Sequence, residues 1–381
     1  MSPEHPAPPL DVDAILADRR VRIVVCCGSG GVGKTTTAAA LGLRAAERHG
    51  RRTVVLTIDP ARRLAQSLGL TELDNTPRHV KDIDGGPAGG ELHAMMLDMK
   101  RTFDEVVQAH TDPRRAAEIF ANPFYQAMSS TFAGTQEYMA MEKLGQLRAR
   151  EEWDLIVVDT PPSRSALDFL DAPARLSRFL DGRMLRLLLA PARAGGRSVF
   201  SLVTASFGVF SRVVQKVLGA QLLTDLSGFV AALDSMFGGF RQRAEQTYQI
   251  LQDRETAFLV VAAPEPDAVR EAAYFARRLR AERMPLAGLI LNRVHRTALP
   301  ELSAADSLAA AERLAAEGGH EIAMDALRVH AALARQAASE ARVAARFTAE
   351  FPTVPAAEVR AQPADVHDVD GLRTIGDALA A

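Results

Sequence analysis

The 381-residue sequence has only two cysteines, Cys26 and Cys27, and they are adjacent. A disulfide framework or a cysteine zinc site needs cysteines at wider spacing, so two neighbouring thiols can form neither. Both cysteines end an apolar run, and we expect them to be buried in a strand. The sequence therefore excludes a disulfide-stabilised fold and a zinc site built from paired cysteines.

Long apolar runs and an excess of one charge are also missing. No apolar run reaches the ~20 residues of a membrane-spanning helix, and the start MSPEHPAPPL lacks the basic and apolar parts of a signal peptide. Lysine and arginine number 45 against 47 acidic residues, so no net field attracts nucleic acid or anionic lipid. We expect a cytoplasmic protein without nucleic-acid binding or direct membrane insertion, and a flexible, proline-rich tail over residues 1–18.

What the sequence does contain is a series of short segments rich in Val, Ile and Leu. They predict strands at 21–27, 53–58, 91–97, 155–159, 257–262 and 286–292, with a weaker candidate at 351–355. These segments are nearly continuous in apolar residues and alternate with helical patterns, which is typical of parallel strands covered on both faces. The sequence predicts an α/β fold with a doubly wound, mostly parallel sheet.

Two segments interrupt this alternation. Residues 102–150 have a mostly helical pattern, and residues 173–252 form a long insert without a convincing strand. We interpret both as helical inserts in one domain that spans residues 19–381. Near the C-terminus, residues 303–348 are rich in alanine, which predicts a pair of covering helices.

The segment GSGGVGKTT, residues 28–36, matches the phosphate-loop pattern G-x-x-x-x-G-K-[ST] between a predicted strand and a predicted helix. Its glycines let backbone N–H groups converge on phosphate oxygens. Lys34 is expected to reach the β- and γ-phosphates, and Thr35 to offer its hydroxyl to Mg²⁺. The predicted nucleotide-binding residues of this loop are Gly28, Ser29, Gly30, Gly31, Val32, Gly33, Lys34, Thr35 and Thr36.

Two aspartates follow predicted strands. Asp159 ends the run LIVVD, and Asp59 follows the run TVVLTI. Since the carboxyl ends of parallel strands meet at one edge of a sheet, we expect both carboxylates near the phosphate loop. Asp159 is the candidate for the metal side of the site, and Asp59 for orienting or deprotonating the attacking water. A single aspartate after a strand is often a helix cap, so the prediction of hydrolysis depends on all three features together.

The segments GSGGVGKTT, TIDPARRLAQSL and DLIVVDTPPSRSALDFL resemble the phosphate loop and the two switches of the arsenite-pump ATPase family, which also contains the tail-anchored-protein targeting ATPase. The likeness continues in residues 133–144, 260–279 and 289–294 and covers most of the chain. It implies a P-loop ATPase that uses ATP and Mg²⁺, with catalytic Lys34, a water-positioning Asp59, a magnesium-side Asp159 and an adenine-recognising Asn292. It also implies a dimer that closes on ATP and opens after hydrolysis.

Departures from the family pattern bear on function. The cysteines of the targeting ATPase's zinc clamp and of the arsenite site are missing, so we expect neither zinc-clamped dimerisation nor arsenite transport. In the second switch, Ser165 and Ala166 stand where the family has His and Thr. Ser29 stands where the family has a lysine that reaches the partner's nucleotide across the dimer.

Ser29 leaves two arrangements open. A homodimer would lack both cross-subunit lysines and would hydrolyse ATP slowly, unless Arg62, Arg63 or Arg164 substitutes. In a heterodimer with a paralogue that retains the lysine, the site of this chain would receive the partner's lysine.

Residues 199–240 carry two apolar stripes at helical spacing. The stripes are Phe200, Val203, Phe207, Phe210, Val214 and Val217, followed by Leu222, Leu226, Phe229, Leu233, Met236 and Phe240. In the targeting ATPase, a helical insert at this place forms a groove for a client's transmembrane helix. Core packing is the commoner role of such stripes, and we favour it, while their length and glycines suit a mobile binding element.

These observations favour an ATPase whose nucleotide cycle switches the insert, so that a hydrophobic protein client or partner is bound in one state and released in another. One alternative is an energising ATPase subunit of a membrane transporter. Another is a nucleotide-dependent scaffold with very low hydrolysis.

Overall fold

The structure is a computed structural model that describes residues 7–59, 63–81, 83, 85, 89–123, 125–126, 135–161 and 242–381, with the backbone alone at 135–137. The chain forms two compact units. The first comprises residues 1–96, 150–167 and 250–381, and the second comprises residues 97–149 and 168–249.

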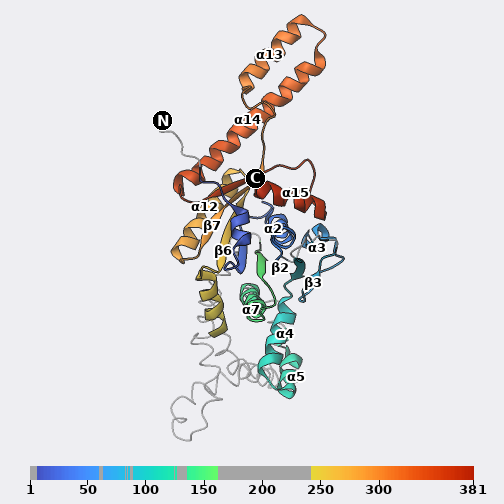
Figure 1. The fold of residues 1–381 in the computed structure, drawn as a ribbon, viewed down its shortest axis with the longest axis vertical. Coiled ribbons are helices and arrows are strands. Elements are labelled where there is room, and N and C mark those ends of the chain that lie inside the picture. The colour runs from blue at the N-terminus through green and yellow to red at the C-terminus, as the bar shows by residue number, and fades with distance from the viewer. Residues whose placement is uncertain are drawn as a thin grey trace, which may run out of the picture. The chain divides into compact units, whose positions relative to one another are not determined.

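The first unit is built on a sheet of eight described strands (Figure 1). They are β1 Ile23–Cys27, β2 Arg52–Thr57, β3 Arg78–His79, β4 Glu91–Met96, β5 Leu155–Asp159, β6 Thr256–Ala262, β7 Leu286–Val294 and β8 Ala356–Arg360. Their order is β3-β4-β2-β5-β1-β6-β7-β8, and every neighbouring pair is parallel except β3 with β4. The predicted doubly wound, mostly parallel fold is confirmed. β1 lies at its centre, between β5 and β6.

Two edge strands differ from the prediction. The candidate at 351–355 is wrong, because the chain becomes a strand only at Ala356. Pro352 and Pro355 have no N–H to donate to a ladder, so pairing with β7 begins after them. β3 was not predicted, since its two residues are exposed and carry no apolar pattern.

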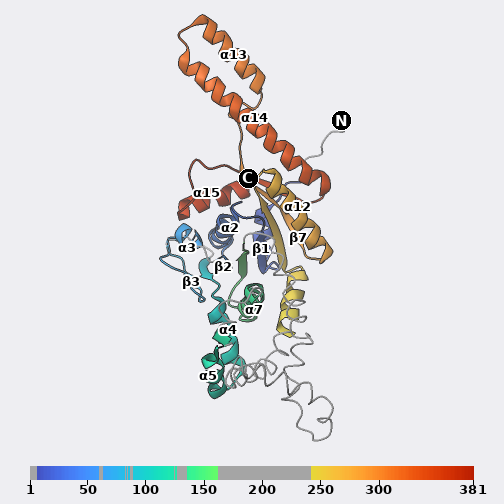
Figure 2. The same ribbon diagram turned by 180° about the vertical axis from the view of Figure 1, so that it is seen from behind.

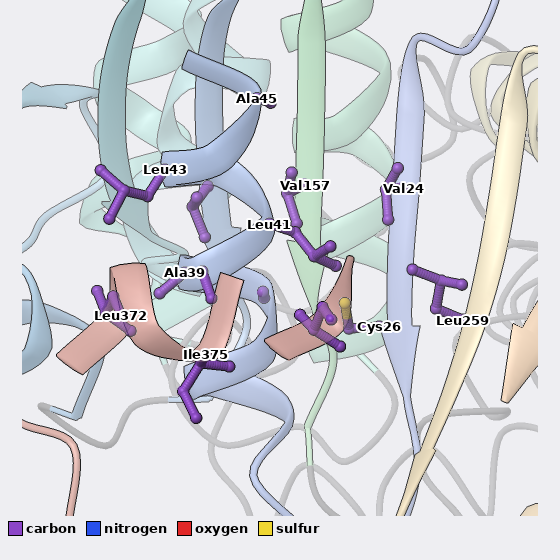
Figure 3. Packing of buried hydrophobic residues seen from close by; sticks show 14 of the residues in the cluster. Val24, Cys26, Ala39, Leu41, Leu43, Ala45, Val157, Leu259, Leu372 and Ile375 are labelled. Atoms are coloured by element: carbon purple, nitrogen blue, oxygen red, sulfur yellow. The ribbon is translucent and has the colours of Figure 1, made fainter. Parts of the chain in front are cut away.

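The helices of the first unit are α1 Val12–Ala17, α2 Lys34–His49, α3 Arg63–Ser67, α12 Pro266–Ala281, α13 Ala304–Glu317, α14 Glu321–Glu350 and α15 Val369–Leu379. Helix α2 packs on the centre of the sheet, and α15 packs on α2 (Figure 3). Leu41 of α2 shares the core with Val24 of β1 and Val157 of β5. Helix α12 packs on β6 and β7. The core therefore fixes the helix that follows the phosphate loop.

Helix α1 lies within the segment where the sequence suggested a flexible tail. Its Val12 and Leu16 are buried. Arg44 of α2 donates to the carboxylate of Asp13 at 2.7 Å, which joins α1 to the central helix. The apolar spacing of Val12 and Leu16 places both on one helical face, and this face holds the segment to the sheet unit.

Helices α13 and α14 form an antiparallel hairpin in the first unit, as the alanine-rich composition predicts (Figures 1 and 2). The C-terminal half of α14 carries the buried residues Val343 and Phe347, and α14 contacts α12 and β7. Near the turn, Ile322 and Val329 are exposed. The hairpin is thus anchored at one end only.

The described part of the second unit is helical. It contains α4 Met99–His110, α5 Pro113–Ala121, α7 Thr135–Ala149 and the helical residues 242–249. Arg243 pairs with the buried carboxylate of Glu142 at 3.0 Å, and its guanidinium lies 2.8 Å from Nε2 of His110. The two apolar stripes of 199–240 lie outside the described residues.

Candidate functional site

The phosphate loop connects β1 to α2 at the carboxyl edge of the sheet. Three of its glycines have positive φ: 154° at Gly28, 77° at Gly31 and 94° at Gly33. A Cβ on Gly28 would lie 2.0 Å from the carbonyl oxygen of Val261 in β6. Only glycine fits there, because both the left-handed backbone and the close approach to β6 exclude a side chain.

Gly33 ends the loop and caps α2 without a side-chain hydrogen bond. The first N–H groups of α2 therefore face the loop without a capping oxygen, which suits an anion. A Cβ on Gly33 would lie 2.2 Å from Nδ2 of Asn292. That same amide nitrogen donates to the carbonyl oxygen of Val32 at 2.9 Å. Asn292 of β7 thus holds the loop at Val32 and Gly33.

Lys34 begins α2, and its side chain is buried in the loop. Its ammonium donates to the carbonyl oxygen of Ser29 at 2.8 Å. Burial lowers the pKa of Lys34, and the nearby carboxylate of Asp159 opposes that shift. The ammonium therefore lies inside the curve of the loop, where phosphate oxygens could replace one backbone carbonyl as its partner.

The remaining loop residues line the same curve. Gly30 and Gly31 are exposed, Val32 is buried, and Thr36 is half-buried in the first turn of α2. The hydroxyl of Ser29 is buried without a hydrogen-bond partner. A serine side chain is short and uncharged, so position 29 adds no cation to the loop.

Asp159 ends β5 and is fully buried beside the loop. Its Oδ2 accepts from the hydroxyls of Thr35, at 2.8 Å, and Thr57, at 2.9 Å. Its Oδ1 is buried without a hydrogen-bond partner. Burial raises the pKa of Asp159 to about 6, although the two threonine hydrogen bonds favour the ionised form. The carboxylate is a desolvated anion with one free oxygen.

The donor set of Thr35 and Asp159 fits a magnesium ion. Mg²⁺ prefers oxygen ligands and commonly takes only one or two from the protein, the rest coming from water and phosphate. Within the described ranges, no cluster of three or more His, Cys, Asp or Glu side chains could hold a metal by itself. The unpartnered Oδ1 of Asp159 is the kind of buried atom that a cation or its water shell would satisfy.

Asp59 lies two residues beyond β2 at the same edge. Its backbone N–H donates to the hydroxyl of Thr57 at 3.2 Å. The backbone N–H of the preceding residue, Ile58, donates to the carbonyl oxygen of Asp159 at 3.0 Å. The structure thus brings Asp59 and Asp159 to neighbouring strand ends. Arg63 begins α3 and is exposed. The other two candidate cations, at 62 and 164, lie outside the described residues.

Two threonines belong to the site although the sequence did not single them out. Thr57 bonds to Asp159 and to the backbone of Asp59 through one hydroxyl. Thr160 donates to the carbonyl oxygen of Cys26 at 2.9 Å and ties the end of β5 to the end of β1. A polar residue that ends an apolar strand is the signal that identifies both.

In the segments that the structure describes, no helix is both long and apolar enough to cross a membrane.

Comparison with known proteins gives one family match. The family model for anion-transporting ATPase covers residues 21–317. An uncharacterised protein of Streptomyces coelicolor is 31% identical over 292 residues, which are 75% of this chain and 65% of that protein. The ATPase GET3 of Malassezia globosa is 28% identical over 46% of this chain and 49% of its own length. The ATPase GET3B of Arabidopsis thaliana is 24% identical over 74% of this chain and 67% of its own. The chain spans about half to two thirds of the length of these relatives.

Proposed function

Because the chain belongs to the anion-transporting ATPase family, we propose that it binds ATP with Mg²⁺ and hydrolyses the bond to the γ-phosphate. The observation that carries the proposal is the meeting of Lys34, Thr35 and Asp159 at one end of the phosphate loop. A buried ammonium, a hydroxyl and a desolvated carboxylate placed together in this way suit a nucleoside triphosphate and its metal. The similarity to ATPase GET3 and ATPase GET3B supports the same reaction.

The loop binds the phosphates through its backbone N–H groups and through Lys34. Thr35 and Asp159 would hold Mg²⁺, which, when bound, neutralises charge on the β- and γ-phosphate oxygens. Asp59 orients the attacking water and accepts its proton. Thr57 acts as a positioning residue, because its hydroxyl links the backbone of Asp59 to the carboxylate of Asp159.

Exchange of Asp59 for asparagine tests this mechanism. Asp59→Asn keeps the size of the side chain but removes the proton acceptor, so we expect ATP binding to persist while turnover falls ~10²- to 10⁴-fold. Asp365→Asn, at an exposed aspartate far along the chain, is the matched control and should leave both unchanged. Binding is measured by calorimetry and turnover by phosphate release. A wild-type protein that binds no ATP would contradict the proposal as a whole.

The nucleotide cycle acts on a protein client or partner through the insert of residues 173–252. The apolar stripes within 199–240 support this, since a long phenylalanine-rich stripe suits the binding of an apolar helix. Affinity purification with Asp59→Asn, which retains ATP, should recover a client that the wild type releases. ANS fluorescence with no nucleotide, ADP and ATP provides a second test, and identical spectra in all three states would contradict a switching groove.

The chain works as a dimer, either with itself or with a paralogue that retains the lysine at the position of Ser29. The absence of a cation at Ser29 supports the paired arrangement, by which we mean the heterodimer with the paralogue. Two other roles differ in outcome: an energising transporter subunit would hydrolyse ATP without a soluble client, and a scaffold would bind ATP with hardly any turnover.

A further inference from the structure

Strand β7 contains a bulge at its contact with the phosphate loop. Leu291 pairs with Glu358 of β8 and Val294 pairs with Arg360, so Asn292 and Arg293 together lie opposite one residue. Such a two-against-one arrangement breaks the strict alternation of side chains along a strand. Bulges of this kind occur beside functional sites, where they redirect a side chain.

The backbone of Arg293 is left-handed, with φ 63°. Two other non-glycine residues in the described segments share this conformation, Glu151 with φ 54° and Arg283 with φ 57°. Each of these follows the end of a helix, α7 or α12, where a left-handed residue commonly terminates the helix. Arg293 ends no helix, and a residue with positive φ inside a strand is usually glycine. A long side chain kept at this unfavourable position calls for a functional explanation.

Asn292 fixes Arg293 to the nucleotide site. Its Oδ1 accepts from the backbone N–H of Arg293 at 3.0 Å, while its Nδ2 donates to the carbonyl oxygen of Val32 at 2.9 Å. An asparagine amide has two donors and two acceptor lone pairs, so one of each remains. That remaining pair complements the edge of adenine, which presents an amine beside a ring nitrogen.

The Arg293 residue itself is exposed, at the same edge of the sheet as the loop. In the part of the chain that the structure describes, its guanidinium has no hydrogen bond or ion pair. A guanidinium is planar, always charged and weakly hydrated, and it stacks on aromatic rings. Because the bulge breaks the alternation of side chains along β7, Asn292 and Arg293 need not face opposite sides of the sheet, and both can reach one ligand.

We propose that Arg293 is a base-binding residue, whose guanidinium stacks on the purine ring of a nucleotide held at its edge by Asn292. The inference rests on the proposed ATP site. It gives the bulge a role: the left-handed backbone turns the chain so that consecutive residues contact the edge and the face of one base.

Calorimetric titration with two probes tests the assignment, MgATP and magnesium tripolyphosphate, which has no base. Arg293→Gly removes the guanidinium and relieves the backbone, so we expect ATP affinity to fall about 3- to 30-fold. Tripolyphosphate affinity and the melting temperature should not fall. Arg293→Lys keeps the charge but loses the planar group, and we expect it to bind ATP as weakly as Arg293→Gly does.

Arg283→Gly is the matched control, since it replaces another exposed left-handed arginine, and it should leave ATP affinity unchanged. Lys34→Ala should weaken the binding of both probes. Wild-type ATP affinity in Arg293→Gly would overturn the inference, and so would wild-type affinity in Arg293→Lys or a loss of tripolyphosphate binding in Arg293→Gly. If the wild-type protein bound neither probe, the proposed ATP site itself would be wrong, which is a different result.

Discussion

The Lys34 ammonium and the Ser29 carbonyl oxygen are 2.8 Å apart, at opposite ends of the phosphate loop. This bond closes the loop around a buried positive charge whose pKa burial has lowered. Carboxylates at neighbouring strand ends, Asp59 and Asp159, balance that charge electrostatically. The loop is therefore shaped around a cation, which makes the cation the first residue to replace.

Lys34→Ala should weaken ATP binding by about tenfold or more, because a charge-assisted hydrogen bond to phosphate is lost. Calorimetry with MgATP measures the change. Lys81→Ala removes an exposed lysine from the same unit and is the control for the loss of one positive charge. Equal affinity in Lys34→Ala and in the wild type would rule out the phosphate-loop assignment.

Ser29→Lys should accelerate ATP hydrolysis by the chain alone. A cation supplied in trans is worth ~10³- to 10⁵-fold in phosphoryl transfer, and the substitution restores one to each subunit of a homodimer. Ser29→Ala, which also removes the buried hydroxyl but adds no charge, should give no gain. Turnover is followed by phosphate release, alone and with the closest paralogue from the same genome. Fast hydrolysis by the wild type alone, with no gain from either the lysine or the paralogue, would contradict the paired arrangement.

Asp159→Asn should stabilise the nucleotide-free protein more at pH 8 than at pH 5. The folded pKa of about 6 exceeds the ordinary value of 3.8, so the native state binds this proton more tightly than the unfolded state does. Stability from this group is complete below pH 3.8 and is lost as pH rises through 6. The full loss is about 3 kcal/mol at most. Asparagine cannot ionise, so the Asp159→Asn variant does not lose this stability as the pH rises.

Thermal melts of the wild type and Asp159→Asn from pH 4 to 8 measure this difference. Asp365→Asn is again the control, because it makes the same exchange at an exposed aspartate. A stability difference that stays constant across the range would mean that Asp159 ionises as easily in the fold as outside it.

Gly33→Ala should destabilise the protein by about 2 to 4 kcal/mol. It adds the cost of a left-handed alanine, about 1 to 2 kcal/mol, to a Cβ placed 2.2 Å from the Asn292 amide. Gly31→Ala shares the positive φ, but its Cβ would meet nothing within 4 Å, so only the backbone cost applies. Urea unfolding of both variants separates the two contributions. Equal losses would show that Asn292 moves aside freely.

The centre of the sheet and the loop could be predicted because their information is local. β5 was predicted at its exact bounds from LIVVD, and the loop's fixed residues follow from one pattern. The last strand begins later than the apolar run 351–355 suggests, because Pro352 and Pro355 have no N–H to donate to a ladder. Where this strand begins depends on its pairing with β7, which a local pattern of apolar residues does not describe.

The less visible parts of the site depend on contacts between distant segments. Asn292 holds Val32, 260 positions away, and Thr57 of β2 donates to Asp159 of the neighbouring strand β5, 102 positions away. No spacing rule along the chain connects such pairs. The left-handed backbone of Arg293 is also invisible in the sequence, since arginine rarely adopts that conformation.

The α13–α14 hairpin projects from an anchored end that packs beside β7 (Figure 1). Val343 is buried at the anchored end, and Ile322 is exposed near the turn. At 1.5 Å per residue, the helix carries Ile322 roughly 30 Å beyond Val343. A rotation of about 10° at the anchored end therefore sweeps Ile322 through roughly 5 Å. Since the anchored end contacts β7, which carries Asn292, a small tilt at the nucleotide edge would be magnified at the far end of the hairpin.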